Sequence, residues 1–180
     1  MINVKEYELI PHKKAQDKYH VKSKEKSICP VCGSLELKVV GTRTRKVLKS
    51  CGKKIILVIR RLRCRSCRRI HHELPDSIVP YKRYSSESIE AILDGMEDTV
   101  SCEESTIYHI RKWFSDFSGY LAGSLDAIAV RLGLKTVVGH KSPMSRIKTY
   151  VGDESGWLAR VVRPLVNSNM WVHTRSAFLS

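Results

Sequence analysis

Four cysteines in two close pairs are the residues of this chain whose type and spacing point most directly to chemistry. Cys29 and Cys32 form the first pair, and Cys64 and Cys67 form the second. A Cys-x-x-Cys turn presents two thiolates to one metal ion, so two such turns supply the four-sulfur set of a tetrahedral structural zinc site. Four thiolates also hold iron, but zinc is the commoner structural choice. The sequence therefore predicts one structural Zn²⁺ ion.

The alternative reading is that these cysteines form redox or disulfide pairs. Disulfides persist in oxidising compartments, and export to them needs an apolar signal segment. The first residues of this chain instead carry Lys5 and other charges. We therefore expect a reducing, cytoplasmic location and a metal site.

The other residues of ligand type have weaker claims to the metal. Cys51 and Cys102 have no partner at knuckle spacing, so each is interpreted as an ordinary cysteine. His71 lies four residues after Cys67 and could replace one ligand. His71 and His72 are adjacent, whereas zinc hydrolases use two histidines four residues apart on a helix, so no catalytic metal is predicted.

The formal net charge of the whole chain is +14, and its basic residues are concentrated in the first half. Residues 1–83 hold 22 lysines and arginines against 7 acidic residues, whereas residues 84–180 hold 10 against 11. Between Lys38 and Arg69 there are 13 basic residues and no acidic one. Solvated basic faces usually interleave acids, so this segment predicts binding to a polyanion, namely nucleic acid. Its candidate contacts are Arg43, Arg45, Lys46, Lys49, Lys53, Lys54, Arg60, Arg61, Arg63, Arg65, Arg68 and Arg69.

The elements that must position these residues begin with a polar leader over residues 1–27. Residues 28–70 contain both cysteine pairs and two strand-like stretches around a turn at residues 50–53. Two knuckles joined by a β-hairpin describe a zinc ribbon, which is too small to be held by its core alone. Residues 71–84, stiffened by Pro75 and Pro80, are interpreted as a connector.

Residues 85–117 predict two short helices. Ser85 begins the first, and the capping-box pair Ser101 and Glu104 begins the second. Two short helices around a break are typical of a helix-turn-helix, although ordinary helical hairpins share the pattern. The candidate groove contacts of its second helix are Ser105, Thr106, His109, Arg111 and Lys112.

Residues 118–180 predict a C-terminal helical extension, with an apolar tail over residues 171–180 that folds back onto the helices or forms an interface. The predicted fold class is therefore α+β. It consists of a small N-terminal zinc-ribbon β-hairpin followed by an all-helical helix-turn-helix region.

The sequence offers little for catalysis or for a membrane. It contains no glycine-rich phosphate loop, no nucleophile elbow and no strand-borne cluster of carboxylates for two metal ions. No apolar run approaches the roughly 18 residues of a membrane-spanning helix. We therefore expect a protein that is not an enzyme and has no membrane partner.

Several motifs resemble those of a known family. They are the two knuckles, the segment IHHELPDSIVPYKRY over residues 70–84, and residues 105–114. They resemble an uncharacterised bacterial family of small zinc-ribbon proteins, many encoded beside transposase genes. The chain is also similar to the N-terminal zinc-ribbon and helix-turn-helix module of insertion-sequence transposases. The resemblance implies an accessory DNA-binding role in a mobile element, with catalysis on a separate polypeptide.

The sequence thus predicts a zinc-dependent protein that binds double-stranded DNA at the nucleoid. A separately encoded transposase and a second copy of the chain are the expected protein partners. An RNA-binding ribbon is an alternative, but residues 29–67 hold no aromatic residue on which unpaired bases could stack. A protein–protein adaptor with structural zinc is a further alternative, distinguished by binding that barely changes with salt.

Overall fold

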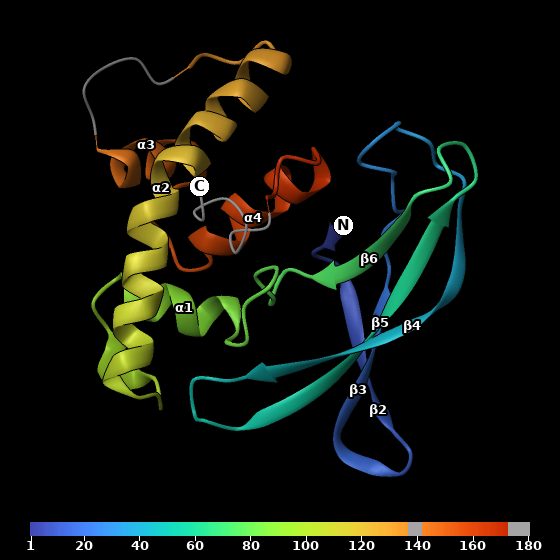
Figure 1. The fold of residues 1–180 in the computed structure, drawn as a ribbon, viewed down its shortest axis with the longest axis horizontal. Helices are drawn as coiled ribbons and strands as arrows, with labels where there is room; N and C mark the ends of the chain where they lie inside the picture. Colours follow the sequence, from blue (N-terminus) through green and yellow to red (C-terminus); the bar gives the residue numbers. More distant parts are fainter. Residues whose placement is uncertain (137–141, 173–180) are drawn as a thin grey trace, which may run out of the picture.

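A curved sheet and a group of helices lie side by side in the computed structural model, which describes residues 1–136 and 142–172 (Figure 1). The sheet contains six strands, and the turn of its longest hairpin lies beside the helices. The strands are β1 (Ile2–Val4), β2 (Tyr7–His12), β3 (Ala15–Ser23), β4 (Leu37–Leu48), β5 (Lys54–Cys64) and β6 (Ile70–Pro75).

Strand β5 is the centre of the sheet because it pairs with three other strands. It is antiparallel to β4 along its whole length, as the predicted hairpin requires. Its other edge is shared between β3, which is parallel to it, and β6, which is antiparallel. The β-branched and aliphatic run from Ile55 to Ile59 suits this position, since both faces of a central strand must be packed. Ile55, Leu57 and Ile59 form a core with Val47 and Leu74.

The polar leader is an integral part of this sheet. Residues 1–27 contribute β1, β2 and β3, and Ile2 and Val4 are buried. Strand β1 runs parallel to β6, within the expected connector, and packs against the last helix. The sheet is therefore a mixed, half-barrel arrangement rather than an isolated ribbon hairpin.

Four α-helices follow: α1 (Ser86–Leu93), α2 (Glu104–Arg131), α3 (Pro143–Val151) and α4 (Trp157–Asn167), with a short 3₁₀ helix η1 (Glu97–Thr99) after α1. Helix α1 begins as predicted, because Ser85 is its N-cap and its hydroxyl accepts a hydrogen bond from the Ser88 N–H. Helix α2 does not begin at a capping box. The Ser101 N–H donates to the Ser50 carbonyl at the hairpin turn (2.7 Å), and Glu103 is the N-cap, without a side-chain cap.

The predicted fold class is wrong on both of its parts. The N-terminal part is a six-stranded mixed sheet, not a small zinc-ribbon hairpin. The second helix of the expected helix-turn-helix is a single 28-residue helix that runs through residue 117. Its buried stripe, which includes Phe114, Phe117 and Leu121, packs continuously into the helical core. Tertiary packing along the whole of α2 thus replaces two short helices around a break.

Helix α4 completes the helical core with Trp157, Leu158, Val161 and Leu165, all fully buried. From the apolar tail, Trp171 contacts the ring of Phe117 (5.5 Å between centroids), while residues 173–180 lie outside the described residues. Among the described residues, no helix combines the length and the apolarity needed to cross a membrane.

Candidate metal centre and basic surface

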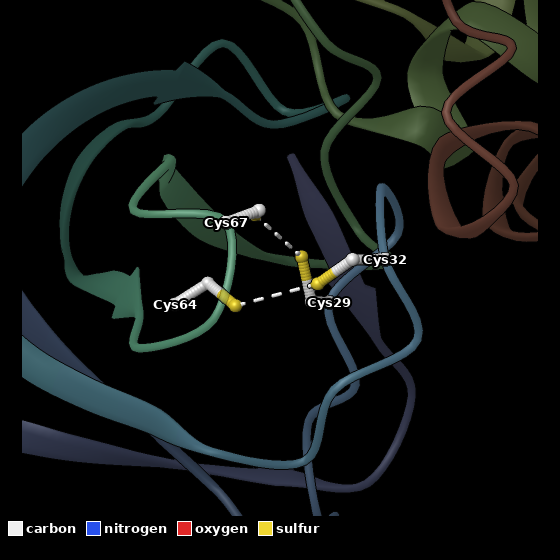
Figure 2. A group of neighbouring side chains, drawn as sticks. All are labelled: Cys29, Cys32, Cys64 and Cys67. Atoms are coloured by element: carbon white, nitrogen blue, oxygen red, sulfur yellow. Dashed lines mark hydrogen bonds between the residues drawn. The ribbon is translucent and has the colours of Figure 1, made fainter.

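The four cysteines of the two predicted pairs meet at one point beside the open end of the β4–β5 hairpin (Figure 2). Their sulfur atoms all lie within 4.8 Å of one another. The Sγ atoms of Cys29 and Cys67 are 3.6 Å apart, as are those of Cys32 and Cys64. A tetrahedral ion with metal–sulfur bonds of about 2.3 Å places its ligands about 3.8 Å apart. The cluster therefore fits a single tetrahedral metal ion, and four thiolates suit zinc or iron.

The two knuckles have the same backbone hydrogen bonds. The Gly33 N–H donates to the Cys29 carbonyl, and the Arg68 N–H donates to the Cys64 carbonyl. In addition, the N–H of the first cysteine of each pair donates to the carbonyl of the residue five positions later in the chain. The residue after each second cysteine is left-handed, with φ of 73° at Gly33 and 64° at Arg68. Arg68 thus adopts the conformation that glycine adopts without strain in the first knuckle.

Hydrogen bonds within the second knuckle favour thiolate formation. The backbone N–H of Cys67, together with that of Ser66, lowers the pKa of Cys64 to about 6 despite burial. Cys67 differs, because the Arg69 N–H lowers its pKa while burial and the neighbouring thiols raise it to about 11. Cys64 is therefore prepared to bind a metal as a thiolate, and a bound cation would favour the thiolate of the others.

His71 lies behind the cluster rather than among its four ligands. Its Nε2 atom is 3.3 Å from the Cys29 Sγ, and both residues are buried. Burial lowers the pKa of His71 to about 4, so the ring is neutral at physiological pH. A neutral imidazole with a proton on Nε2 donates to a thiolate at this distance. The sequence signal for this role is the position of His71, four residues beyond Cys67.

A buried carboxylate near the centre was not predicted. Glu73 is 1 % exposed and accepts two hydrogen bonds from Arg60 (2.6 and 2.8 Å) and one from the Ser27 hydroxyl. The sequence signal is the spacing of two residues between His71 and Glu73, which places both side chains on the same face of β6. Arg60, one of the predicted nucleic-acid contacts, is therefore part of an internal ion pair.

The structure distributes the remaining predicted contacts of the sheet over three places. Arg63, on β5, and Arg65, Arg68 and Arg69, in the second knuckle, are exposed. Lys49, Lys53 and Lys54 surround the hairpin turn, where Lys53 pairs with Asp17 at 3.0 Å. Arg43, Arg45 and Lys46, on β4, line hollows that they share with Arg61, His72 and residues 81–83. The last group was not predicted as a unit, because residues 72 and 81–83 come from the expected connector.

The predicted contacts on α2 lie in acidic surroundings. Arg111 pairs with Glu97 (2.8 Å), and Lys112 pairs with Asp116 (3.4 Å). Both basic residues line a cleft of about 750 Å³ that also holds four acidic residues. The other candidates, Ser105, Thr106 and His109, lie on the same first half of the helix. Phosphate groups are repelled by such surroundings, so α2 is a weaker polyanion surface than the sheet.

Part of the chain matches a known protein family. Residues 29–110 match the model of a family described as a domain of unknown function (DUF6431). The matched segment begins at the first metal-site cysteine and includes both cysteine pairs. No curated protein and no solved structure matches the chain. The match supports the similarity to an uncharacterised family, and it carries no information about transposons or DNA.

Proposed function

We propose that this protein is a metal-stabilised DNA-binding protein, without catalysis of its own, that holds duplex DNA against the basic surface of its sheet. The observation that carries the proposal is the run of basic residues from Lys38 to Arg69, which contains no acid and ends in the second knuckle. A metal at the four cysteines would hold the start of β4 and the end of β5 together at the open end of the hairpin. The hairpin would then present its charges as one rigid surface.

The pairing of charges favours the sheet over α2 as the DNA-contacting element. Arg43, Arg45 and Arg61 form no ion pair with any described residue, whereas Arg111 and Lys112 on α2 are both neutralised. Unpaired arginines are available to release counterions from DNA, which is the main source of affinity for phosphate backbones. Phosphate contacts carry no base sequence, so this surface supports affinity more than specificity.

The role in a mobile element rests only on the resemblance to zinc-ribbon proteins that are encoded beside transposase genes. It makes the protein an accessory or regulatory factor that acts beside a separately encoded transposase. The near-neutral helical half, residues 84–180, is the better surface for such a protein partner, because it would not repel or trap other proteins by charge.

The test is the salt dependence of binding to a blunt duplex by the zinc-loaded protein. If about six to eight phosphates are engaged, log K should fall against log salt with a slope of about −5 to −7. Arg63→Gln on β5 should make the slope shallower by about 1, and the matched variant Arg111→Gln on α2 should leave it unchanged. Binding that hardly responds to salt would overturn the proposal and favour a protein–protein adaptor. Clearly tighter binding to duplex RNA would also overturn it.

A further inference from the structure

Three adjoining hollows on the sheet form one groove. All three are lined by Arg43, and two of them are also lined by Arg45 and Tyr81. The most enclosed part has a volume of about 320 Å³ and is lined in addition by His72. Arg61 lines the end beside His72. We call these five residues the arginine groove, and no acidic residue lines any of its three parts.

The pairing of strands brings the arginines of the groove together. Arg43 and Arg45 are two residues apart on β4, so their side chains leave the same face of the strand. Arg61 on β5 lies opposite Gly41 on β4 and opposite His72 on β6. A register shift between Val39 and Gly41 bends β4 next to Arg61. Three consecutive strands of the chain thus direct like charges at one place.

This concentration of charge is uncompensated within the described residues. Arg61 Nε is buried and has no hydrogen-bond partner, in contrast to the neighbouring Arg60, which pairs with Glu73. Burial, followed by the charge of Arg43, lowers the pKa of Arg45. Burial, followed by the charges of Arg43, Arg61 and Arg45, lowers the pKa of His72. Partly buried like charges destabilise one another until an anion binds between them, and an arginine fork fits the oxygens of a phosphate.

Tyr81 supplies an aromatic surface at the same groove. It lines two of the three hollows and is 46 % exposed. Its backbone is left-handed, with φ of 66°, a conformation that is unusual for a bulky residue and recurs at binding sites. The next residue, Lys82, places its ammonium 3.9 Å from the ring centroid of Trp113 on α2, which anchors this loop to the helices. Tyr81 is therefore presented beside the arginines by a loop that is fixed at its base.

We propose that the arginine groove binds one unpaired nucleotide of a DNA strand, with its phosphate between Arg43, Arg45 and Arg61 and its base stacked on Tyr81. The inference deepens the proposed function and rests on it, because it assigns the place where the DNA departs from a regular duplex. A base inside a duplex is stacked on both sides and cannot also stack on a side chain, so an aromatic surface next to a phosphate site selects an unpaired base.

The experiment compares a blunt duplex with the same duplex carrying a short unpaired tail of deoxynucleotides on one strand. Fluorescence anisotropy of the zinc-loaded protein at fixed salt should show about tenfold tighter binding to the tailed duplex, from one stacked base. Tyr81→Ala should abolish this preference and leave binding to the blunt duplex unchanged, and Tyr81→Phe should retain it. Arg43→Gln should weaken binding to the tailed duplex by about tenfold, because it removes a forked phosphate contact. The matched variant Arg63→Gln should weaken both probes equally.

The outcomes separate this inference from the proposed function. The groove would be overturned, and the proposed function would stand, if the protein binds the blunt duplex in a salt-dependent way but does not prefer the tailed duplex. In that case Arg43→Gln would weaken binding to the tailed duplex no more than Arg63→Gln does. A preference for the tail that survives Tyr81→Ala would also overturn it. If no duplex binds, the proposed function fails. Binding at the groove is then tested by itself, by titration with a 5′-phosphorylated dinucleotide. Weakening of that titration by both Tyr81→Ala and Arg43→Gln would support the groove, and its absence would overturn it.

Discussion

His71 shows how a single side chain can tune the metal centre without being a ligand. It lies in the buried interior, 3.3 Å from the sulfur of Cys29, while the four sulfur atoms already satisfy a tetrahedral ion. A neutral imidazole donor holds a thiolate in place and disperses part of its charge. Because Cys29 itself is only 1 % exposed, water cannot take over this role.

We therefore predict that His71→Ala lowers zinc affinity by about 10- to 100-fold, the usual effect of losing a hydrogen bond to a metal ligand. His71→Gln, which keeps a donor, should recover part of the loss. The measurement is competition for zinc with a chromogenic chelator. His72→Ala is the matched control, since His72 lies in the groove and is not hydrogen-bonded to a sulfur atom. Equal effects of His71→Ala and His72→Ala would contradict this role.

At the scale of elements, the sequence predicts those parts whose signals are local. The cysteine spacing predicts the metal cluster, the β-branched run after the turn predicts the hairpin, and Ser85 predicts the start of α1. The sequence does not predict the part of the sheet formed by β1 to β3, because β1 has only three residues, and Val21 is the only buried residue of β2 and β3. Their pairing depends on contacts with β5 and β6, which lie far along the chain. Ser101 failed as a cap for the same reason, because the hairpin turn binds its N–H group.

The contact between α1 and α4 is another feature that the sequence does not predict. Helix α4 has no side-chain cap of its own, and Gly156 before it is left-handed. The buried carboxylate of Glu90 on α1 accepts the N–H groups of Gly156 (2.5 Å) and Leu158 (2.8 Å). A carboxylate at a helix N-terminus satisfies free N–H groups and complements the helix dipole.

Replacing Glu90 should therefore destabilise the whole helical core. We predict that Glu90→Ala lowers the free energy of unfolding by about 3 kcal/mol, since two charge-assisted hydrogen bonds are lost in a buried position. Glu90→Gln should cost less, because its amide oxygen can still accept. Urea denaturation measures both. Glu87→Ala changes an exposed glutamate of the same helix and should cost less than about 0.5 kcal/mol. A loss below 1 kcal/mol for Glu90→Ala would show that α4 does not depend on this cap.

For the whole molecule, the sheet and the helices are tied together at several points. Strand β1 packs on α4, where the Asn167 side chain accepts from the Asn3 N–H and donates to the Asn3 carbonyl. Glu25 pairs with Arg163 (2.7 Å), and the hairpin turn binds Ser101. Removing residues 118–180 would cut α2 in the middle and remove α4 both from the helical core and from its contact with β1. The packing therefore indicates one cooperative folding unit, in which the basic sheet and the near-neutral helices cannot be separated.

This cooperativity can be tested with tryptophan fluorescence, because all three tryptophans lie in the helical half, whereas the four metal-site cysteines lie in the sheet half. We predict that a zinc chelator lowers the midpoint of thermal unfolding measured by tryptophan fluorescence. A metal that binds only the folded chain stabilises every part that unfolds with the site, by about 4 kcal/mol when it is present at a thousand times its dissociation constant. Cys51→Ser should respond like the unaltered protein, since Cys51 is exposed at the hairpin turn.

Cys64→Ser should instead begin at the lower midpoint and be insensitive to the chelator, because it lacks one of the four ligands. The opposite result would be an unchanged tryptophan transition alongside a separate, earlier loss of β-sheet signal in circular dichroism. It would mean that the ribbon unfolds alone and that contacts through β1, Glu25 and Ser101 are too weak to couple it to the helices. A shared transition would show that metal loss at one end of the sheet reaches the helical core, and with it any partner that the helices bind.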